Sequence, residues 1–289
     1  MAEHQKHTKL MKPNWGKYGC RTLSLMGGDP HNVKKLVENT AKKIRVAWIK
    51  NSLSNDFSKE VIFYSPEGEV ESKFEYRSMS AYLQLEHLFW NCQLIFEADS
   101  DREIDGVIVF DNQAEELPED IIAVCGGLPS GQTPYFSKKA LDRLIDFVYS
   151  WLKKQMTVPL YGLVLVGGKS SRMKRDKSSL HYQNKNQREI GFEMLKKHCS
   201  EVFLSCRSAQ SQFMEHQYLE DKFLNLGPLG GIMTAQQYNP QVAWLVIACD
   251  LPLLSEETIN FLKQKRNPLK IATVFKQEEQ EFPEPMVSI

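Results

Sequence analysis

The sequence predicts an α/β protein with two domains, each a three-layer arrangement of helices around a mostly parallel sheet. Its 289 residues are about twice the roughly 150 residues of an average domain, so a single small module is excluded. Short apolar runs of the kind found in buried strands alternate with amphipathic helical segments along the chain, which is the pattern of a parallel sheet. The composition, with 42% hydrophobic and 25% charged residues, excludes a disordered or collagen-like chain.

Net charge and the length of apolar runs exclude several classes of partner. Lysine plus arginine and aspartate plus glutamate both number 36, so any anion must be bound by a local cluster rather than by a globally basic surface. The longest apolar run, residues 242–249, is far shorter than the roughly 18 residues of a membrane span. The six cysteines stand singly without a C-x-x-C pair, which favours reduced thiols over disulfides or zinc. We therefore expect a cytoplasmic protein with neither nucleic-acid nor membrane partners.

The first half of the chain predicts a βαβ unit that further strands extend. The apolar runs predicted as strands are residues 22–26, 45–50, 92–96, 106–110 and 121–125. A glycine-containing turn at 27–32 and a helix at 33–43 connect the first two of them. Pro66-Glu67-Gly68 predicts a hairpin turn between two more strands, at 61–64 and 70–76.

A domain boundary is predicted near residue 157. Residues 137–154 place apolar side chains on one face at helical spacing, which predicts an amphipathic helix. Pro159 ends any continuation of that helix, and residues 160–168 then have the pattern of a buried strand that runs into a glycine turn. We therefore predict a first domain over residues 1–157 and a second over residues 158–289.

The second domain repeats the order strand, helix, strand, helix. The predicted strands are residues 201–206, 242–249 and 270–275, and the predicted helices are residues 229–238 and 255–265, the latter capped by Ser255. This order predicts a Rossmann-like, doubly wound, mostly parallel sheet. Sheets of this kind bind ligands at the carboxyl ends of their strands.

The most informative segment follows the first strand of the second domain. Gly167 and Gly168 allow the backbone to turn tightly, and free N–H groups in such a loop can bind an anion. Residues 169–177 then contain five lysines and arginines against one acid, Asp176, which is the local charge that a triphosphate requires. The alternative is a solvated basic loop, but its place after a sheet strand favours a phosphate site. The segment matches neither the Walker A nor the G-x-G-x-x-G pattern.

Two further segments fit a nucleotide site. Asp250 follows the buried strand at 242–249, so its carboxylate would reach the crevice above the sheet and bind a hard cation such as Mg²⁺. The alternatives for Asp250 are a helix cap or a solvated strand end. Residues 227–231, Gly-Pro-Leu-Gly-Gly, open the helix at 229–238 and favour an anion at its N-terminus. A tight loop packed on the sheet explains this segment nearly as well.

Three motifs in the correct order make residues 160–289 resemble the molybdenum cofactor guanylyltransferases, the MobA family of nucleotidyltransferases. The family's opening signature L-A-G-G-x-S-x-R-M-G-x-D-K, its G-P-L-x-G turn and its C-D-x-P segment all have counterparts in this sequence. The matching residues are Leu165, Gly167, Gly168, Ser170, Arg172, Met173, Asp176, Lys177, residues 227–231, Cys249, Asp250 and Pro252.

The resemblance implies a nucleotide-binding role for six residues, one of which is Asp250, the expected Mg²⁺ ligand. Leu165, Gly167 and Gly168 would line a guanine-nucleotide pocket, and Lys177 would contact the phosphates. Asp221, a few residues before the G-P-L-G-G turn, matches a nucleotide-binding aspartate of the family.

The resemblance also implies the reaction. Lys177, Arg172 and Asp250 would be the catalytic residues, with Mg²⁺ as cofactor on Asp250, and GMP would pass from GTP to the phosphate of molybdopterin with release of pyrophosphate. The partners would be GTP, molybdopterin or molybdenum cofactor, and molybdoenzyme apoproteins or their chaperones. The alternatives are CTP with molybdopterin, another NTP with a sugar phosphate, and a non-catalytic adapter that binds nucleotide or molybdenum cofactor.

The sequence departs from the family pattern at several points. Val166 and Lys174 replace the usual Ala and Gly, and Leu204 stands where some members have a nucleotide-contacting Asn, so base selectivity is less defined than the reaction class. The family continues past the E-P-x-V segment matched by residues 284–287. This chain stops at Ile289, and we therefore expect an incomplete catalytic domain.

The front domain more faintly resembles the MobB-like, P-loop-type adapter that is fused to this transferase in some bacteria. The resemblance rests on residues 6–10 and on the strand, turn and helix around Gly27. Asn32-Val33-Lys34-Lys35 stands where an intact Walker A has G-K-[ST], so Lys34 can pair with a phosphate but no hydroxyl follows to hold Mg²⁺. We therefore expect a binding or docking role rather than NTP hydrolysis.

Overall fold

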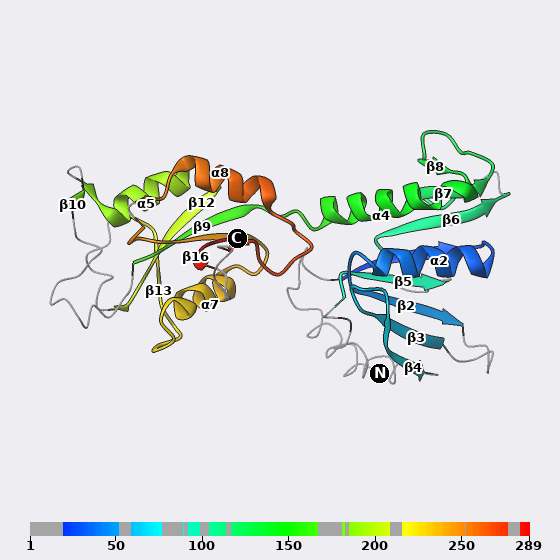
Figure 1. The fold of residues 1–289 in the computed structure, drawn as a ribbon, viewed down its shortest axis with the longest axis horizontal. Helices are drawn as coiled ribbons and strands as arrows, with labels where there is room; N and C mark the ends of the chain where they lie inside the picture. The colour runs from blue at the N-terminus through cyan, green and yellow to red at the C-terminus, as the bar shows by residue number, and fades with distance from the viewer. Residues whose placement is uncertain are drawn as a thin grey trace. The chain divides into compact units, whose positions relative to one another are not determined.

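The computed structural model forms two compact units (Figure 1). Among the described residues, the front unit extends to Met156, and the second unit begins at Thr157. The structure describes residues 20–51, 59–76, 89, 92–98, 104–113, 117–166, 181–182, 185–208, 216–251, 253–276 and 284–289.

The front unit contains an eight-stranded sheet in the order β4-β3-β2-β5-β1-β6-β7-β8. Its strands are β1 (Arg21–Met26), β2 (Val46–Asn51), β3 (Lys59–Tyr64), β4 (Val70–Tyr76), β5 (Leu94–Ala98), β6 (Gly106–Asn112), β7 (Ile121–Gly127) and β8 (Tyr135–Phe136). Neighbours pair in parallel except at β2–β3 and β3–β4, which are antiparallel. The predicted βαβ unit with further parallel strands is therefore present.

In the described part of this unit, two α-helices accompany the sheet, α2 (Pro30–Ala41) and α4 (Leu141–Gln155), with the 3-10 helix η2 (Lys138–Ala140) before α4. Helix α2 begins three residues earlier than predicted, because Pro30 suits the first helical position and Asp29 caps the helix by accepting a hydrogen bond from Asn32 N. The helices pack against each other, and Lys43 after α2 forms an ion pair with Asp146 on α4 at 2.5 Å.

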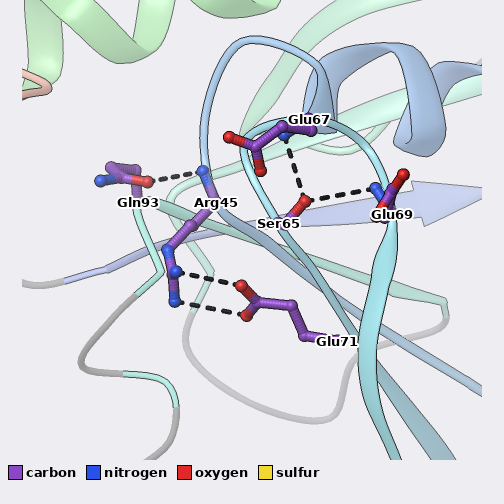
Figure 2. Close-up of polar contacts among 6 residues, drawn as sticks. All are labelled: Arg45, Ser65, Glu67, Glu69, Glu71 and Gln93. Carbon is purple, nitrogen blue, oxygen red and sulfur yellow. Dashed lines mark hydrogen bonds and ion pairs between the residues drawn. The ribbon is translucent and has the colours of Figure 1, made fainter.

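The predicted hairpin joins β3 to β4 through a turn that one serine organises (Figure 2). The Ser65 hydroxyl oxygen accepts hydrogen bonds from the backbone N–H groups of Glu67 and Glu69, at 3.2 and 3.4 Å. Both guanidinium nitrogens of Arg45 contact the Glu71 carboxylate, at 3.0 and 3.3 Å. The bidentate pair ties the start of β4 to the residue that precedes β2.

The second unit contains a six-stranded sheet in the order β13-β12-β9-β14-β16-β15. Its strands are β9 (Leu160–Leu165), β12 (Glu201–Cys206), β13 (Tyr218–Glu220), β14 (Ala243–Ala248), β15 (Val274–Phe275) and β16 (Glu284–Ser288), and β10 (His181–Tyr182) pairs separately with β11 (Lys185–Asn186). The four strands from β13 to β14 are parallel, whereas β16 pairs antiparallel with both β14 and β15.

Helices cover both faces of the second sheet. Helices α5 (Gln187–Lys196) and α8 (Glu256–Lys265) pack on one face, and α7 (Pro228–Tyr238) packs on the other (Figure 1). Alternate residues of β9 point to the two faces, with Val164 on the α5 and α8 side and Leu165 on the α7 side. The predicted α/β class with mostly parallel sheets is confirmed. Among the described residues, no helix has both the length and the apolar content of a membrane span.

The strand predicted at 270–275 is wrong over most of its length, since β15 covers only Val274 and Phe275. Asn267, which precedes Pro268, instead organises a turn. Its side-chain oxygen accepts from Leu269 N at 3.1 Å, and its carbonyl accepts from Lys270 N at 3.0 Å. Asn before Pro is a turn signal that outweighs the apolar character of the residues that follow.

Replacing Gly127 at the end of β7 with alanine should destabilise the front unit strongly. Gly127 has a φ of +71°, and a Cβ there would lie 2.1 Å from the carbonyl oxygen of Asn112. Gly131 is the matched control, because its φ is +50° but no atom lies within 4 Å of its Cβ position. We expect Gly127→Ala to lower the free energy of unfolding by about 3 kcal/mol and Gly131→Ala by about 1 kcal/mol. Urea unfolding measures both, and equal losses would contradict the steric argument.

Candidate functional site

The carboxyl ends of β12, β9 and β14 meet at one edge of the second sheet. From β9 the chain enters β12 on one side and later enters β14 on the other side, so the direction of strand addition reverses at β9. Open α/β sheets bind their ligands at such a reversal, beyond the carboxyl ends of the strands. This edge is therefore the candidate site.

Leu165 is the last residue of β9 and is buried. Its carbonyl oxygen accepts a hydrogen bond from Cys249 N at 3.2 Å, and Val166 N donates to the carbonyl of Ser205 at 3.1 Å. These bonds continue the sheet one residue beyond the strand on both sides. They fix the starting point of the glycine segment between β12 and β14.

Four of the predicted site residues lie outside the described residues. Gly167, Gly168, Arg172 and Lys177 belong to the segment between Val166 and His181, and their roles remain predictions.

Asp221 directly follows β13 at this edge and is half-buried. Its carboxylate Oδ1 accepts a hydrogen bond from the Ser205 hydroxyl at 2.6 Å, and its N–H donates to the carbonyl of Cys206 at 2.8 Å. Burial raises the pKa of Asp221, while the Ser205 hydrogen bond and the nearby Arg207 guanidinium act in the opposite direction. The structure thus gives the predicted nucleotide-binding aspartate a fixed orientation.

Helix α7 holds the residues that follow Asp221. The Thr234 hydroxyl accepts from Lys222 N at 3.0 Å and donates to the carbonyl of Gly230 at 2.8 Å, closing a small network on the helix. A Cβ at Gly230 would lie 2.2 Å from the carbonyl oxygen of Phe223, so only glycine allows the helix to approach this closely.

The N-terminus of α7 has no side-chain cap. Gly227 is the N-cap residue, with a φ of +60° that favours glycine, and Pro228 occupies the first helical position. Uncapped N–H groups and the helix dipole together favour an anion at such a terminus. The G-P-L-G-G segment therefore combines close packing on the sheet with a helix end suited to phosphate.

Asp250 lies in the turn after β14 and is exposed. Two strands, β12 and β9, separate β13 from β14, so Asp221 and Asp250 are about three strand spacings apart, or roughly 14 Å. The two predicted acids are therefore not brought into contact. Among the described residues, no three His, Cys, Asp or Glu side chains are grouped to hold a metal. A single exposed carboxylate nevertheless fits Mg²⁺, which is often held by one or two carboxylates plus substrate phosphates.

Sequence reasoning missed Ser205 and Thr234. Both side chains are 2% exposed, Ser205 in the apolar strand β12 and Thr234 in α7. The available signal was a hydroxyl inside a segment predicted to be buried, because a buried polar group requires a partner. The partner could not be identified, since Asp221 is 16 residues from Ser205 in the chain.

The front unit has a second glycine turn after its own central strand, but its electrostatics differ. Gly27 and Gly28 have φ values of +70° and +91°. Asp29 then caps α2 with its own carboxylate, at 3.3 Å from Asn32 N. Lys34 is exposed and contacts Glu38 at 3.6 Å within the same helix. A phosphate at this terminus would face a carboxylate that already occupies it.

Comparison with known proteins finds a family model that matches most of the second unit. Residues 162–288 match the family model of the MobA-like NTP transferase domain. The chain is 40% identical over 129 residues to the "Molybdenum cofactor biosynthesis bifunctional protein" of Synechocystis sp.. This matched region is 44% of this chain and 37% of that protein. It is 32% identical over 120 residues to the "Probable molybdenum cofactor guanylyltransferase" of Flavobacterium johnsoniae. This matched region is 42% of this chain and 63% of the relative.

The chain thus spans less than two thirds of the length of these curated relatives. Among solved structures, molybdopterin-guanine dinucleotide biosynthesis protein A of Archaeoglobus fulgidus is similar, with 22% identity and a TM-score of 0.36 over 44% of this chain and 65% of that one. The three sequence motifs and the family match fall on the same α/β unit. Residues 162–288 of this chain are therefore similar to the MobA-like NTP transferase domain, and this similarity covers most of the second unit.

Proposed function

We propose that this chain transfers GMP from GTP to the terminal phosphate of molybdopterin and releases pyrophosphate. The observation that carries the proposal is the Asp221 carboxylate, oriented by Ser205 beside the uncapped N-terminus of α7 at the ligand-binding edge of a MobA-like domain. The names of the two curated relatives, a molybdenum cofactor biosynthesis protein and a molybdenum cofactor guanylyltransferase, support the choice of base and acceptor.

The proposed reaction is an in-line displacement. An oxygen of the molybdopterin phosphate attacks the α-phosphorus of GTP, the bond from that phosphorus to the bridging oxygen breaks, and pyrophosphate leaves with the electron pair. Leu165, Gly167 and Gly168 would line the nucleotide pocket, while Lys177 and Arg172 would offset the charge that develops on the phosphates. Such a reaction depends on positioning and electrostatics, because the attacking phosphate needs no strong base.

Asp250 is the proposed ligand of Mg²⁺. Its place at the reversal of strand order and its exposure leave the carboxylate accessible from the ligand side of the sheet. Bound there, Mg²⁺ would neutralise charge on the triphosphate.

We assign the front unit a docking role in the same pathway, as an adapter related to MobB. Its mostly parallel sheet and its glycine turn support the assignment, and the self-capped α2 terminus argues against NTP hydrolysis there. Molybdoenzyme apoproteins or their chaperones are the partners that such a unit would bind. All six cysteines are free thiols, which fits a reducing compartment, and we place the protein in the cytoplasm.

Asp250→Asn tests the catalytic proposal. The substitution keeps the shape of the side chain but removes the charge that a hard cation requires, so the rate of pyrophosphate release from GTP with molybdopterin should fall about 100-fold. Glu201→Gln is the control, because Glu201 is an exposed acid at the opposite end of the parallel strands. Pyrophosphate release measured at several Mg²⁺ concentrations should show the loss only for Asp250→Asn. Wild-type rates in both variants would exclude Asp250 from the reaction.

Base selectivity can be read from thermal shifts. GTP at about 100 times its Kd should raise the Tm of the second unit by about 10 °C, because ligand binding to the folded state stabilises it by mass action. CTP and UTP at the same concentration should give smaller shifts, because only the correct base gains its hydrogen bonds. A larger shift with CTP would favour cytidylyl transfer, and no shift with any nucleotide would contradict nucleotide binding altogether.

A further inference from the structure

Ser205 is a hydroxyl residue in an otherwise apolar part of β12. Its neighbours in the strand, Leu204 and Cys206, are buried and pack with the α5 and α8 layer, whereas Ser205 lies on the α7 side. The hydroxyl is removed from water and donates to Asp221 Oδ1 at 2.6 Å, a length typical of a hydrogen bond to a charged carboxylate. Loss of this partner would leave the buried hydroxyl without a hydrogen bond, which destabilises the folded protein.

Helix α7 encloses this hydroxyl. A Cβ at Gly231 would lie 2.2 Å from Ser205 Oγ, 3.1 Å from Ser205 Cβ and 3.0 Å from Leu165 Cδ2. The serine hydroxyl thus fills the space that any side chain at position 231 would require. Gly231 of the G-P-L-G-G segment and Ser205 of β12 therefore pack directly against each other. The Ser205 hydroxyl links this contact to the carboxylate of Asp221.

Among the described residues, few charged groups lie near Asp221. Arg207 after β12 carries the opposite charge, and Glu220 and Lys222 are its chain neighbours. The Cys206 thiol is also close, but burial raises its pKa to about 11, so it is neutral near pH 7. No residue of α7 is charged. Ser205 and Arg207 are therefore the two groups that counteract the effect of burial, which raises the pKa of Asp221.

We propose that Ser205 is a positioning residue of the nucleotide site: its hydroxyl orients the Asp221 carboxylate for hydrogen bonds donated by the nucleotide. The inference rests on the proposed function, which assigns Asp221 to nucleotide binding. Without the hydroxyl, only Arg207 still opposes the effect of burial on the pKa of Asp221, so this carboxylate takes up a proton at higher pH. A protonated carboxyl loses acceptor capacity, so nucleotide binding should be complete at high pH and should be lost as the pH falls through the raised pKa of Asp221.

The test is a double-mutant cycle on the Kd for GTP, measured by titration calorimetry at about pH 8 and about pH 5.5. We expect Ser205→Ala to weaken GTP binding about tenfold at the lower pH and less at the higher pH. Asp221→Asn, which cannot ionise, should weaken binding without this pH dependence. Adding Ser205→Ala to Asp221→Asn should change the Kd little, because the serine acts through the carboxylate.

Two controls separate this role from a general effect on the fold. Ser205→Thr keeps the hydroxyl and should bind GTP more tightly than Ser205→Ala at the lower pH. Ser200→Ala removes a hydroxyl at the opposite end of the sheet, where it donates to the carbonyl of Leu160 at 3.2 Å, and should leave the Kd unchanged.

The inference and the proposed function fail in different ways. An effect of Ser205→Ala that is equal at both pH values, or that persists in the Asp221→Asn background, would overturn the positioning role. If the wild-type protein binds no GTP, the proposed function itself is wrong. Thermal unfolding without ligand shows whether each variant is folded. If Ser205→Ala is not, Ser205→Cys takes its place, because a thiol of similar size donates a much weaker hydrogen bond.

Discussion

The contact of Gly231 on α7 with Ser205 on β12 is the constraint on which the described part of the candidate site depends. Because position 231 lacks a Cβ, the first turn of α7 lies directly against the ends of β12 and β9. On the same helix, the Thr234 hydroxyl accepts a hydrogen bond from Lys222 N. Gly230 lies as close to the carbonyl of Phe223 as Gly231 lies to the Ser205 hydroxyl, since a Cβ at either glycine would be 2.2 Å from that oxygen. The residues after β13 are thus held between a strand and a helix by hydrogen bonds and close packing. A side chain at either glycine would separate these elements, and Asp221 would lose its fixed orientation.

Patterns of apolar residues were sufficient to predict the fold class, because the strands that form the centre of each sheet are buried on both faces. Residues 201–206 coincide with β12, and the strand predicted at 242–249 extends one residue beyond β14 at each end. Elements at the margins of the second sheet were harder to predict. β13 has only three residues, two of them exposed, and so leaves no apolar run. At 270–275 the local hydrogen bond of the Asn267 side chain to Leu269 N favours a turn where the apolar residues favour a strand. Hydrophobic periodicity does not reveal such a local interaction.

The site was less predictable than the fold for a physical reason. Asp250 could be found from the sequence because it directly follows a strand, and the chain direction then determines the edge at which it lies. Asp221 follows a short strand without a pattern and was found only through family resemblance. Ser205 acts through a partner 16 residues away, and its hydroxyl is ordinary in sequence terms until the fold places it between β12 and α7. Contacts of this kind depend on helix and strand packing, which sequence periodicity does not specify.

The chain uses the same architectural element twice with opposite electrostatic results. In each unit, a central parallel strand ends near glycines and a helix begins close to that edge of the sheet. Helix α2 is capped by the Asp29 carboxylate, so its positive end is already neutralised by the chain itself. Helix α7 begins with glycine and proline, has no side-chain cap and carries no charge. Of these two arrangements, only the second leaves the positive end of the helix available to an external anion.

Asp221 and Asp250 differ in the property that decides what each carboxylate can bind. Asp221 is half-buried and held by a hydroxyl, so it offers an oriented acceptor for donors of a ligand at low cost in side-chain entropy. Asp250 is exposed, which suits a strongly hydrated cation that keeps several of its waters. The two acids lie on opposite sides of β9, from which the glycine segment leaves the sheet. Under the proposed function, a nucleotide at this edge of the sheet would therefore meet a rigid acceptor on one side of β9 and an accessible carboxylate on the other, which divides base recognition and charge neutralisation between two acids of different exposure.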